Sequence, residues 1–333
     1  LVSSLLRDGA NPNDLHHKYQ YTPLMFAAIS GKEEICRILM DAGAYADIKN
    51  SIGKTAVEMA ALVGKHECVS VINSHIGLGE VERIVYPSDG KNNKKYPVDF
   101  VKLAHVTVRT HHIHPVKLVL FMQRNPTLLQ NREKYLYVID RIFERQLRYN
   151  NANEVLSVKL WIILFILRQA NTFVSNNIDS GKTISRLLLI YAKHVLAMKP
   201  NDMVRPRIET ILRNAIKSYP YYNLLLVQML AKALSRGSLP GAYFFVMQAL
   251  FGHQMASFAK FCSTCGVPDA HKCCCNCKTL YCSINCQKFD WHIHKKCCST
   301  IEISPPTPAD EIVDELDVSY SKIAISHYIS LNI

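Results

Sequence analysis

The sequence predicts a mainly α-helical protein in three parts: a stack of helical repeats, an all-helical middle region and a small module stabilised by metal. Three observations predict this class. The first 79 residues repeat with a period near 33, and apolar residues from about 97 to 256 recur at helical spacing. Ten of the twelve cysteines fall between Cys262 and Cys298.

Composition and length are those of a soluble globular protein with two or three domains, at 333 residues, 49% hydrophobic and 20% charged. The longest apolar run, residues 160–167, is far shorter than the roughly 20 residues that cross a bilayer, so we expect a buried helix and no membrane span. No secretory signal is visible, which predicts a cytoplasmic protein whose cysteines stay reduced and favours metal ligation over disulfides. The opening segment looks like the second half of a repeat, so we expect the N-terminus to be the edge of a fragment.

The repeat is visible in pairs of matching residues. Thr22 recurs as Thr55 and Gly31 as Gly64, each 33 residues later. This period and the word YTPLMFAA resemble ankyrin repeats, and residues 1–79 hold about two and a half of them. The resemblance implies a stack that binds proteins.

Packing explains the repeat pattern. Thr22 precedes the first helix, where proline is tolerated at the first position, and Gly31 closes that helix at a turn. Ile35, Ile38 and Leu39 are predicted to bury the second helix. Cys68 matches Ile35 in the next repeat, so we expect a core thiol and not a reactive one.

Residues 80–96 are predicted to be a polar linker, and residues 97–256 an all-helical region of six or so helices. Two stretches match the helical template at i, i+3, i+4, i+7 and i+8. They are Leu226, Met229, Leu230, Ala233 and Leu234, and Leu188, Tyr191, Ala192, Val195 and Leu196. The pattern leaves open whether the helices form a bundle or an irregular solenoid.

Two motifs in the middle region do not support a site. Residues 180–183 (SGKT) resemble the end of a phosphate-binding loop, but position 176 is Asn where that loop needs Gly, and no strand precedes it. His111, His112 and His114 have no helical ligand spacing and no cysteine or carboxylate beside them, so we expect a solvated loop.

Charge is unevenly distributed along the chain. The formal net charge is +12, and residues 80–255 alone carry +14. Such a region could attract an acidic partner or an anionic surface. Because its Lys and Arg residues are scattered among apolar ones, we interpret it as a solvated basic surface.

The C-terminal cysteines form metal-ligand pairs. The order is Cys-x-x-Cys, Cys-x-x-Cys, Cys-x-x-x-Cys and His-x-x-x-Cys. Four pairs suffice for two closed tetrahedral zinc sites. A segment this short cannot bury enough apolar surface to fold alone, so the metal would supply much of its stability.

This order of ligands resembles the MYND zinc finger over residues 262–298, and the flanking Tyr281, Gln287 and Trp291 fit as well. The resemblance implies a cross-brace with two structural zinc ions. The first zinc would take Cys262, Cys265, Cys282 and Cys286, and the second Cys274, Cys277, His294 and Cys298.

Three cysteines are surplus to these eight ligands. Cys273 and Cys275 flank Cys274 but lack the two-residue gap to Cys277, and Cys297 competes with Cys298 for the last position. The family's three-residue gap favours Cys298.

In the MYND family a Gln and a Trp help to form a groove for proline-containing peptides. Gln287 and Trp291 occupy the matching positions, which makes them candidates for peptide binding. The alternative, that Trp291 simply anchors the small core, stays open.

Ankyrin repeats, a helical region and a MYND finger in this order resemble the ankyrin-repeat and MYND-domain-containing protein 2 family. This implies a non-enzymatic adaptor with protein partners and no small-molecule substrate, and a role in delivering signalling proteins to the cilium. Enzymes with MYND fingers would need an Asn-His-x-Cys or a His-x-Asp word, and neither occurs. The alternative is a nucleic-acid-associated or corepressor-type zinc-finger adaptor, which lacks a clustered basic recognition helix here.

The last segment, residues 299–333, opens rich in proline and then turns acidic. Segments of this composition cannot bury enough apolar surface to fold, so we expect a disordered tail.

Overall fold

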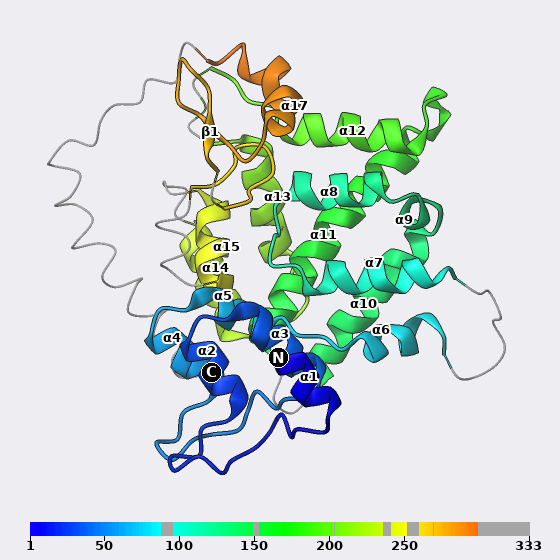
Figure 1. Cartoon of the computed structure of the whole chain (residues 1–333). Helices are drawn as coiled ribbons and strands as arrows, with labels where there is room; N and C mark the ends of the chain where they lie inside the picture. Colours follow the sequence, from blue (N-terminus) through cyan, green and yellow to red (C-terminus); the bar gives the residue numbers. More distant parts are fainter. Residues whose placement is uncertain are drawn as a thin grey trace, which may run out of the picture.

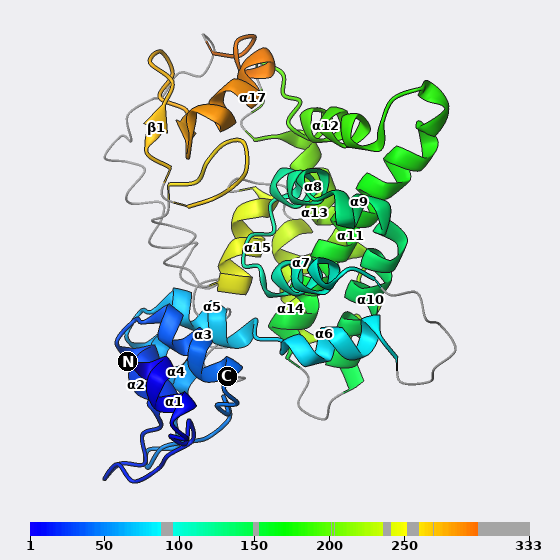
Figure 2. The same ribbon diagram turned by 45° about the vertical axis from the view of Figure 1, so that its right-hand side comes forward.

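The computed structural model describes residues 1–87, 96–148, 153–200, 202, 204–235, 241–251, 260–268 and 270–298. The repeats lie at one end of a helical middle region and the cysteine-rich module lies at the opposite end (Figure 1, Figure 2). The predicted tail, residues 299–333, falls outside the described residues.

The repeat end consists of short helices in antiparallel pairs. They are α1 (Val2–Arg7), α2 (Pro23–Ile29), α3 (Glu33–Asp41), α4 (Ala56–Leu62) and α5 (His66–Asn73). α1 stands as the second helix of a preceding pair, as the sequence predicts.

Side-chain caps start the first helix of each full repeat. Thr22 Oγ1 accepts a hydrogen bond from the amide of Met25 at 3.2 Å. Thr55 Oγ1 accepts one from the amide of Glu58, whose carboxylate in turn accepts from the amide of Thr55 at 2.8 Å. This reciprocal capping box satisfies backbone donors that the helix itself leaves free. Gly31 follows with φ +67°, a conformation that glycine adopts without strain.

The buried face of α3 is shifted from the predicted one. Leu39 is buried as expected, but Ile35 and Ile38 are only half-buried, and Cys36 is fully buried in their place. Cys68 of α5 is also fully buried, in agreement with the predicted core thiol. The two thiols hydrogen-bond each other, which raises the pKa of Cys36.

The predicted linker is helical in its first part. α6 (Leu78–Val85) buries Val81, Ile84 and Val85 against the middle region. Spacings of three and one place these side chains on one helix face, a pattern hidden among the charged residues of this segment. The sequence interpretation as a polar linker was therefore wrong for residues 80–85, and residues 88–95 lie outside the described chain.

The middle region is built from helices, most of them packed around one long central helix, α11. Their bounds are α7 (Val98–Arg109), α8 (Pro115–Arg124), α9 (Pro126–Gln130), α10 (Arg132–Arg148), α11 (Glu154–Asn176), the 3₁₀ turn η1 (Ile178–Ser180), α12 (Ile184–Val195), α13 (Pro206–Lys217), α14 (Leu225–Ser235) and α15 (Ala242–Phe251). These exceed the six or so expected helices, because Pro115 and Pro126 open two of them at breaks that the sequence interpretation did not use.

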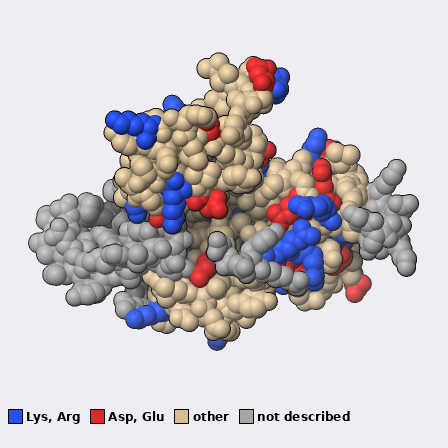
Figure 3. Space-filling view, turned by 90° about the horizontal axis from the view of Figure 1, so that it is seen from below, with Lys and Arg blue, Asp and Glu red and all other residues tan. Residues whose placement is uncertain are grey.

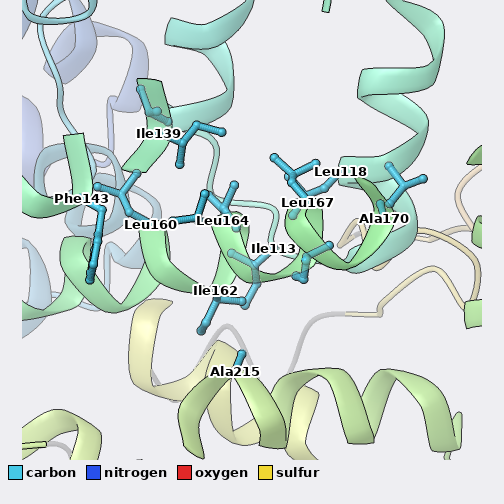
Figure 4. Close-up of a cluster of buried hydrophobic side chains, with 14 of the residues drawn as sticks. Ile113, Leu118, Ile139, Phe143, Leu160, Ile162, Leu164, Leu167, Ala170 and Ala215 are labelled. Carbon is cyan, nitrogen blue, oxygen red and sulfur yellow. The ribbon is translucent and has the colours of Figure 1, made fainter. Parts of the chain in front are cut away.

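α11 contains the apolar run of residues 160–167, and the run is buried as predicted except for Trp161 and Phe165, which are half-buried. Figure 4 shows Leu160, Leu164 and Leu167 of α11 among apolar side chains of the neighbouring helices. By length and composition α11 could cross a membrane. In this structure it is instead the centre of the largest apolar core.

The motif at residues 180–183 is a connection between helices. Gly181 adopts φ +68°, and the Thr183 hydroxyl accepts a hydrogen bond from the amide of Arg186 at the start of α12. These residues therefore serve as a helix stop and a helix cap.

Charged side chains of both signs are mixed on the surface. On the face seen in Figure 3, the largest group of basic side chains stands beside acidic ones. Arg141 pairs with Glu144 at 2.8 Å and Arg168 with Asp140 at 3.0 Å. This mixture agrees with the interpretation as a solvated surface.

The repeat stack contacts the middle region through polar bonds. Asp41 at the end of α3 accepts from Arg109 at 2.8 Å and lies 3.1 Å from His75 Nε2. Asn153, the cap of α11, donates to the carbonyl of Asn73 at 2.9 Å. These bonds connect the end of the stack to the ends of α7 and α11.

Candidate metal centre

Two similar backbone turns present the first four cysteines. In the first, the amide of Gly266 donates to the carbonyl of Cys262 at 2.8 Å, and in the second the amide of Lys278 donates to Cys274 at 3.1 Å. The residue after each Cys-x-x-Cys pair has positive φ, +65° at Gly266 and +59° at Lys278. Each turn therefore curls its two thiols toward one point.

A short hairpin, one helix and the turn that follows it, which contains Cys298, supply the other four ligand candidates. β1 (Lys272–Cys273) pairs antiparallel with β2 (Leu280–Tyr281), and Cys282 follows directly. α17 (Ile284–His294) begins after Ser283, whose hydroxyl accepts a hydrogen bond from the amide of Cys286 at 3.2 Å. Cys286 thus lies in the first turn of α17, and His294 is its last residue.

The structure brings the eight predicted ligands together in the two predicted sets. In each set the ligand atoms all lie within 4.8 Å of one another. In the first set, the sulfur of Cys282 lies 3.6 Å from Cys265 and 3.5 Å from Cys286. In the second set, Cys298 lies 3.5 Å from Cys274, and Cys277 lies 3.4 Å from His294 Nε2.

These separations suit a tetrahedral metal ion. Zinc–sulfur bonds of about 2.3 Å place two sulfurs of a regular tetrahedron about 3.8 Å apart. Disulfide sulfurs would lie about 2.05 Å apart, and all twelve cysteines are free thiols. Both clusters could therefore hold a metal ion.

The thiols within a cluster could not all ionise without a cation. Cys265 hydrogen-bonds Cys262, which lowers the pKa of Cys262 and raises the pKa of Cys265. A hydrogen bond with Cys262 also raises the pKa of Cys286 to about 12. Four thiolates this close repel one another, so a bound cation is needed to stabilise them together.

The three surplus cysteines lie apart from the clusters. Cys273 and Cys275 are exposed. Cys297 is buried, with its sulfur 3.7 Å from the carbonyl oxygen of Met198 in the middle region. The structure thus places Cys298 with the second set, while Cys297 faces away toward the α12–α13 connection.

The first cysteine turn is fitted tightly against the middle region. Tyr243 of α15 donates from its hydroxyl to the carbonyl of Gly266 at 3.0 Å. A Cβ atom on Gly266 would lie 2.5 Å from that hydroxyl and 2.7 Å from His114 Cδ2. Only glycine fits this contact.

His114 belongs to the histidine group expected in a solvated loop, and that expectation was wrong. His111 and His112 are half-buried, while Ile113 and His114 are buried. Burial lowers the pKa of His111 to about 4 and that of His112 and His114 to about 3, so these imidazoles are neutral at pH 7. Gly266 of the cysteine-rich module lies against His114, and the local sequence pattern of residues 111–115 does not indicate this contact.

A buried ion pair joins α17 to the middle region. Arg205, which precedes α13, donates to Asp290 Oδ2 at 2.8 Å, and the Tyr281 hydroxyl donates to the same oxygen at 3.0 Å. Asp290 and Tyr281 are fully buried. Phe289 and Ile293 of α17 pack against the large core of the middle region.

Lys117 of α8 lies in the field of the first cluster. Burial lowers the pKa of Lys117, while Cys265, Cys282 and Cys286 act in the opposite direction. A cation there offsets part of the negative charge of a metal bound by four thiolates. Lys117 lies some 150 residues before the cysteines in the chain, so the local sequence around the ligands does not indicate its proximity.

A cavity of about 840 Å³ lies along the same junction. Its walls include Ile208 and Phe244 from the middle region and Leu280 and Ile293 from the module. The module therefore meets the middle region around this cavity, and Arg205 and Tyr243 also line it.

The two candidate peptide contacts lie on α17. Gln287 is half-buried and Trp291 is 47% exposed. Trp291 is therefore not the anchor of the small core, where Tyr281 lies instead.

Comparison with known proteins supports the helical repeats directly. The family model "Ankyrin repeats" matches residues 1–78 in three copies. Shorter matches include glycerophosphocholine phosphodiesterase gde1 of Schizosaccharomyces pombe, 35% identical over 24% of this chain and 7% of that protein. Another is E3 ubiquitin-protein ligase KEG of Arabidopsis thaliana, 35% identical over 22% of this chain and 4% of that protein. No solved structure matches the chain.

One similarity covers nearly the whole chain. Dauer abnormal formation protein 25 of Caenorhabditis elegans is 43% identical over 98% of this chain and 86% of its own length. The match therefore includes the repeats, the helical middle and the cysteine-rich module together. The chain belongs to the family of Dauer abnormal formation protein 25.

Proposed function

We propose that this protein is a non-enzymatic adaptor that binds partner proteins at two ends, through ankyrin repeats and through a MYND-type zinc module. The observation that carries the proposal is the pair of closed clusters, each with four Cys or His ligand atoms within 4.8 Å. A metal held by four protein ligands has no open position for water or substrate. The metal would then hold the fold together and take no part in catalysis.

Zinc is the ion that these ligands fit best. Cysteine thiolates and an imidazole in tetrahedral sets are the usual ligands of structural zinc. The interleaved order, in which the first and third pairs share one site and the second and fourth share the other, supports a MYND-type cross-brace. Each ion would connect segments distant in sequence, so the two sites would fold together.

The repeat end offers an exposed aromatic surface for a protein partner. Phe26 on α2 is 46% exposed and Tyr19 in the preceding loop is 52% exposed. The ring of His17 lies within 6 Å of both, at 5.1 Å and 5.8 Å between centroids. Exposed aromatic side chains are common at protein interfaces.

The other end would bind proline-containing peptides at Gln287 and Trp291. The exposure of Trp291 supports this role, because an exposed aromatic ring can stack on proline. By family resemblance we further propose a cytoplasmic adaptor that helps deliver signalling proteins to the cilium. Its test is whether a tagged Gln287→Ala, Trp291→Ala variant still supports ciliary delivery in cells that lack the native protein.

Metal analysis tests the zinc proposal. Purified protein should carry two zinc ions per chain, and the Cys274→Ser, Cys277→Ser double variant should carry about one. A Cys273→Ser, Cys275→Ser variant is the matched control and should keep two. Zinc contents that do not follow this order would overturn the ligand assignment.

Quantitative affinity capture tests the adaptor proposal. Two double variants are compared: one combines Tyr19→Ala with Phe26→Ala, and the other combines Gln287→Ala with Trp291→Ala. Each should lose a different subset of the partners captured by the native protein. All of these side chains are exposed or half-exposed, so folding should be retained. Retention of every partner by both variants would contradict the two-ended adaptor.

A further inference from the structure

The outward face of α17 carries an exposed stripe of apolar and basic side chains. Ile284, Lys288, Trp291 and Lys295 follow at spacings of four, three and four residues, which places them on one side of the helix. Ile284 is 54% exposed and Trp291 47% exposed, and both lysines are exposed. We call these four residues the α17 stripe.

The opposite face of α17 is fully used. Asp290 and His294 are buried in the module, and Phe289 and Ile293 pack against the middle region. The α17 stripe therefore lies on the side of the helix that the described part of the chain leaves exposed to solvent. An exposed Ile and Trp flanked by two cations suit a ligand that is both apolar and acidic.

The chain itself contains a segment with this chemistry close behind α17. Residues 304–317 read SPPTPADEIVDELD, with three prolines followed by five acidic residues and with no Lys or Arg. Proline-rich segments dock on exposed aromatic rings, and the following carboxylates complement Lys288 and Lys295. The overall charge of −5 is opposite to that of the stripe.

The segment can reach the stripe. The seven residues from Cys298 to Pro305 can span up to about 24 Å when extended. α17 has 11 residues and is about 16 Å long. Trp291 lies seven residues before Cys298, so the chain needs only to turn back along the helix.

We propose that residues 304–317 bind the α17 stripe in the same molecule and thereby compete with partner peptides for the module. This inference rests on the proposed peptide-binding role of Gln287 and Trp291. A short tether makes the local concentration of the segment millimolar, so even weak binding in cis would occupy the stripe for much of the time. Partners would then have to displace the chain's own tail.

The test uses the full chain and a synthetic peptide of residues 303–318 that carries a fluorophore. The native protein is compared with a Pro305→Ala, Pro306→Ala, Pro308→Ala variant, whose own segment should no longer bind. We expect the labelled peptide to bind this variant on the order of ten-fold more tightly than it binds the native protein, because competition in cis is removed. A Ser321→Ala, Ser326→Ala, Ser330→Ala variant is the matched control and should behave as the native protein does.

Two further arms locate the site and separate this inference from the proposed function. Adding Trp291→Ala to the triple-proline variant should abolish peptide binding, and adding Lys288→Gln and Lys295→Gln should weaken it and remove its salt dependence. A panel of unrelated proline-containing peptides tests the groove itself. If those peptides bind through Trp291 but the tail peptide binds the native and triple-proline proteins equally or not at all, the cis contact is wrong and the groove remains. If no peptide of either kind binds, the peptide-binding role fails as well.

Discussion

A buried lysine in the middle region, far from the cysteines, affects the stability of this protein. Lys159 is fully buried in α11, and its ammonium donates to the carbonyl of Val108 in the last turn of α7 at 2.8 Å. Burial lowers the pKa of Lys159 to about 7, with Arg109 nearby acting in the same direction. A buried lysine that is half neutral at physiological pH is a source of instability that its one hydrogen bond offsets only in part.

Replacing Lys159 with methionine should stabilise the middle region in a pH-dependent way. The folded pKa lies below the ordinary value of 10.5, so the unfolded chain binds more protons between about pH 7 and pH 10.5. Native stability therefore rises as pH rises through this window. At pH 7 we expect the free energy of unfolding of Lys159→Met to exceed the native value by about 2–4 kcal/mol, the lost hydrogen bond included.

Urea unfolding followed by tryptophan fluorescence measures this difference at several pH values. The gap between variant and native protein should shrink from pH 7 to pH 9. Lys182→Met, at an exposed lysine, is the control and should show neither effect. A constant gap across this range would mean that Lys159 does not titrate in it.

Gly266 should be irreplaceable for two separable reasons. Its φ of +65° disfavours any side chain, and a Cβ would meet the Tyr243 hydroxyl at 2.5 Å. Gly181 has a similar φ of +68° but open space around it. Gly181→Ala is therefore a control that measures only the cost of placing a side chain at positive φ. We expect Gly266→Ala to destabilise the protein by about 2–4 kcal/mol and Gly181→Ala by about 1–2 kcal/mol. Thermal unfolding of both variants measures the difference, and a Gly266→Ala, Tyr243→Phe double variant should recover part of it.

At the scale of elements, what the sequence predicted depended on whether the pattern was local. The repeat helices, α12 and the ligand pairs follow from spacing within a short window, and the structure agrees with their placement. α6 was missed because its three apolar contacts lie within a charged segment. The burial of His114 was missed because it depends on a module about 150 residues later in the chain. Ridges and cavities between distant elements leave no periodic signal in one sequence.

α17 links the metal clusters to the middle region, and the Arg205–Asp290 pair is central to that link. The Asp290 side chain is fully buried, and that of Arg205 is 13% exposed. Removing one partner of a buried pair leaves an uncompensated charge and costs about 3–5 kcal/mol. Arg205→Leu should therefore loosen the module and speed zinc release to a chelator.

Two further variants serve as controls for Arg205→Leu. Arg168→Leu removes a pair with Asp140 whose arginine side chain is 46% exposed, and it should cost less than about 1 kcal/mol. Adding Asp290→Asn to Arg205→Leu should restore much of the lost stability, because the buried charge is gone. Zinc release from Arg205→Leu at the native rate would contradict the structural role of the pair.

At the scale of the whole molecule, the repeats and the cysteine-rich module are expected to differ in how their stability depends on metal. The repeats have their own apolar core, and the cysteine-rich module has only small clusters of buried side chains around its thiols. The module is also fixed to the middle region by Tyr243, Arg205 and the α17 side chains Phe289 and Ile293. Loss of metal should therefore destabilise the adjoining part of the middle region as well as the module, and it should leave the repeats folded.

Hydrogen–deuterium exchange with and without a zinc chelator tests this transmission. Chelation should raise exchange in residues 262–298 to the level of an unfolded chain, because the metal supplies most of the stability of such a module. Exchange should also rise, by a smaller factor, at the start of α13, in α15 and around His114, which lose their contacts with Asp290 and Gly266. α2 to α5 should keep their protection, since within the described residues their apolar core includes no residue of the module. Equal deprotection of the repeats would show that the whole chain unfolds as one unit, and unchanged protection in α13 and α15 would show that the module is only tethered.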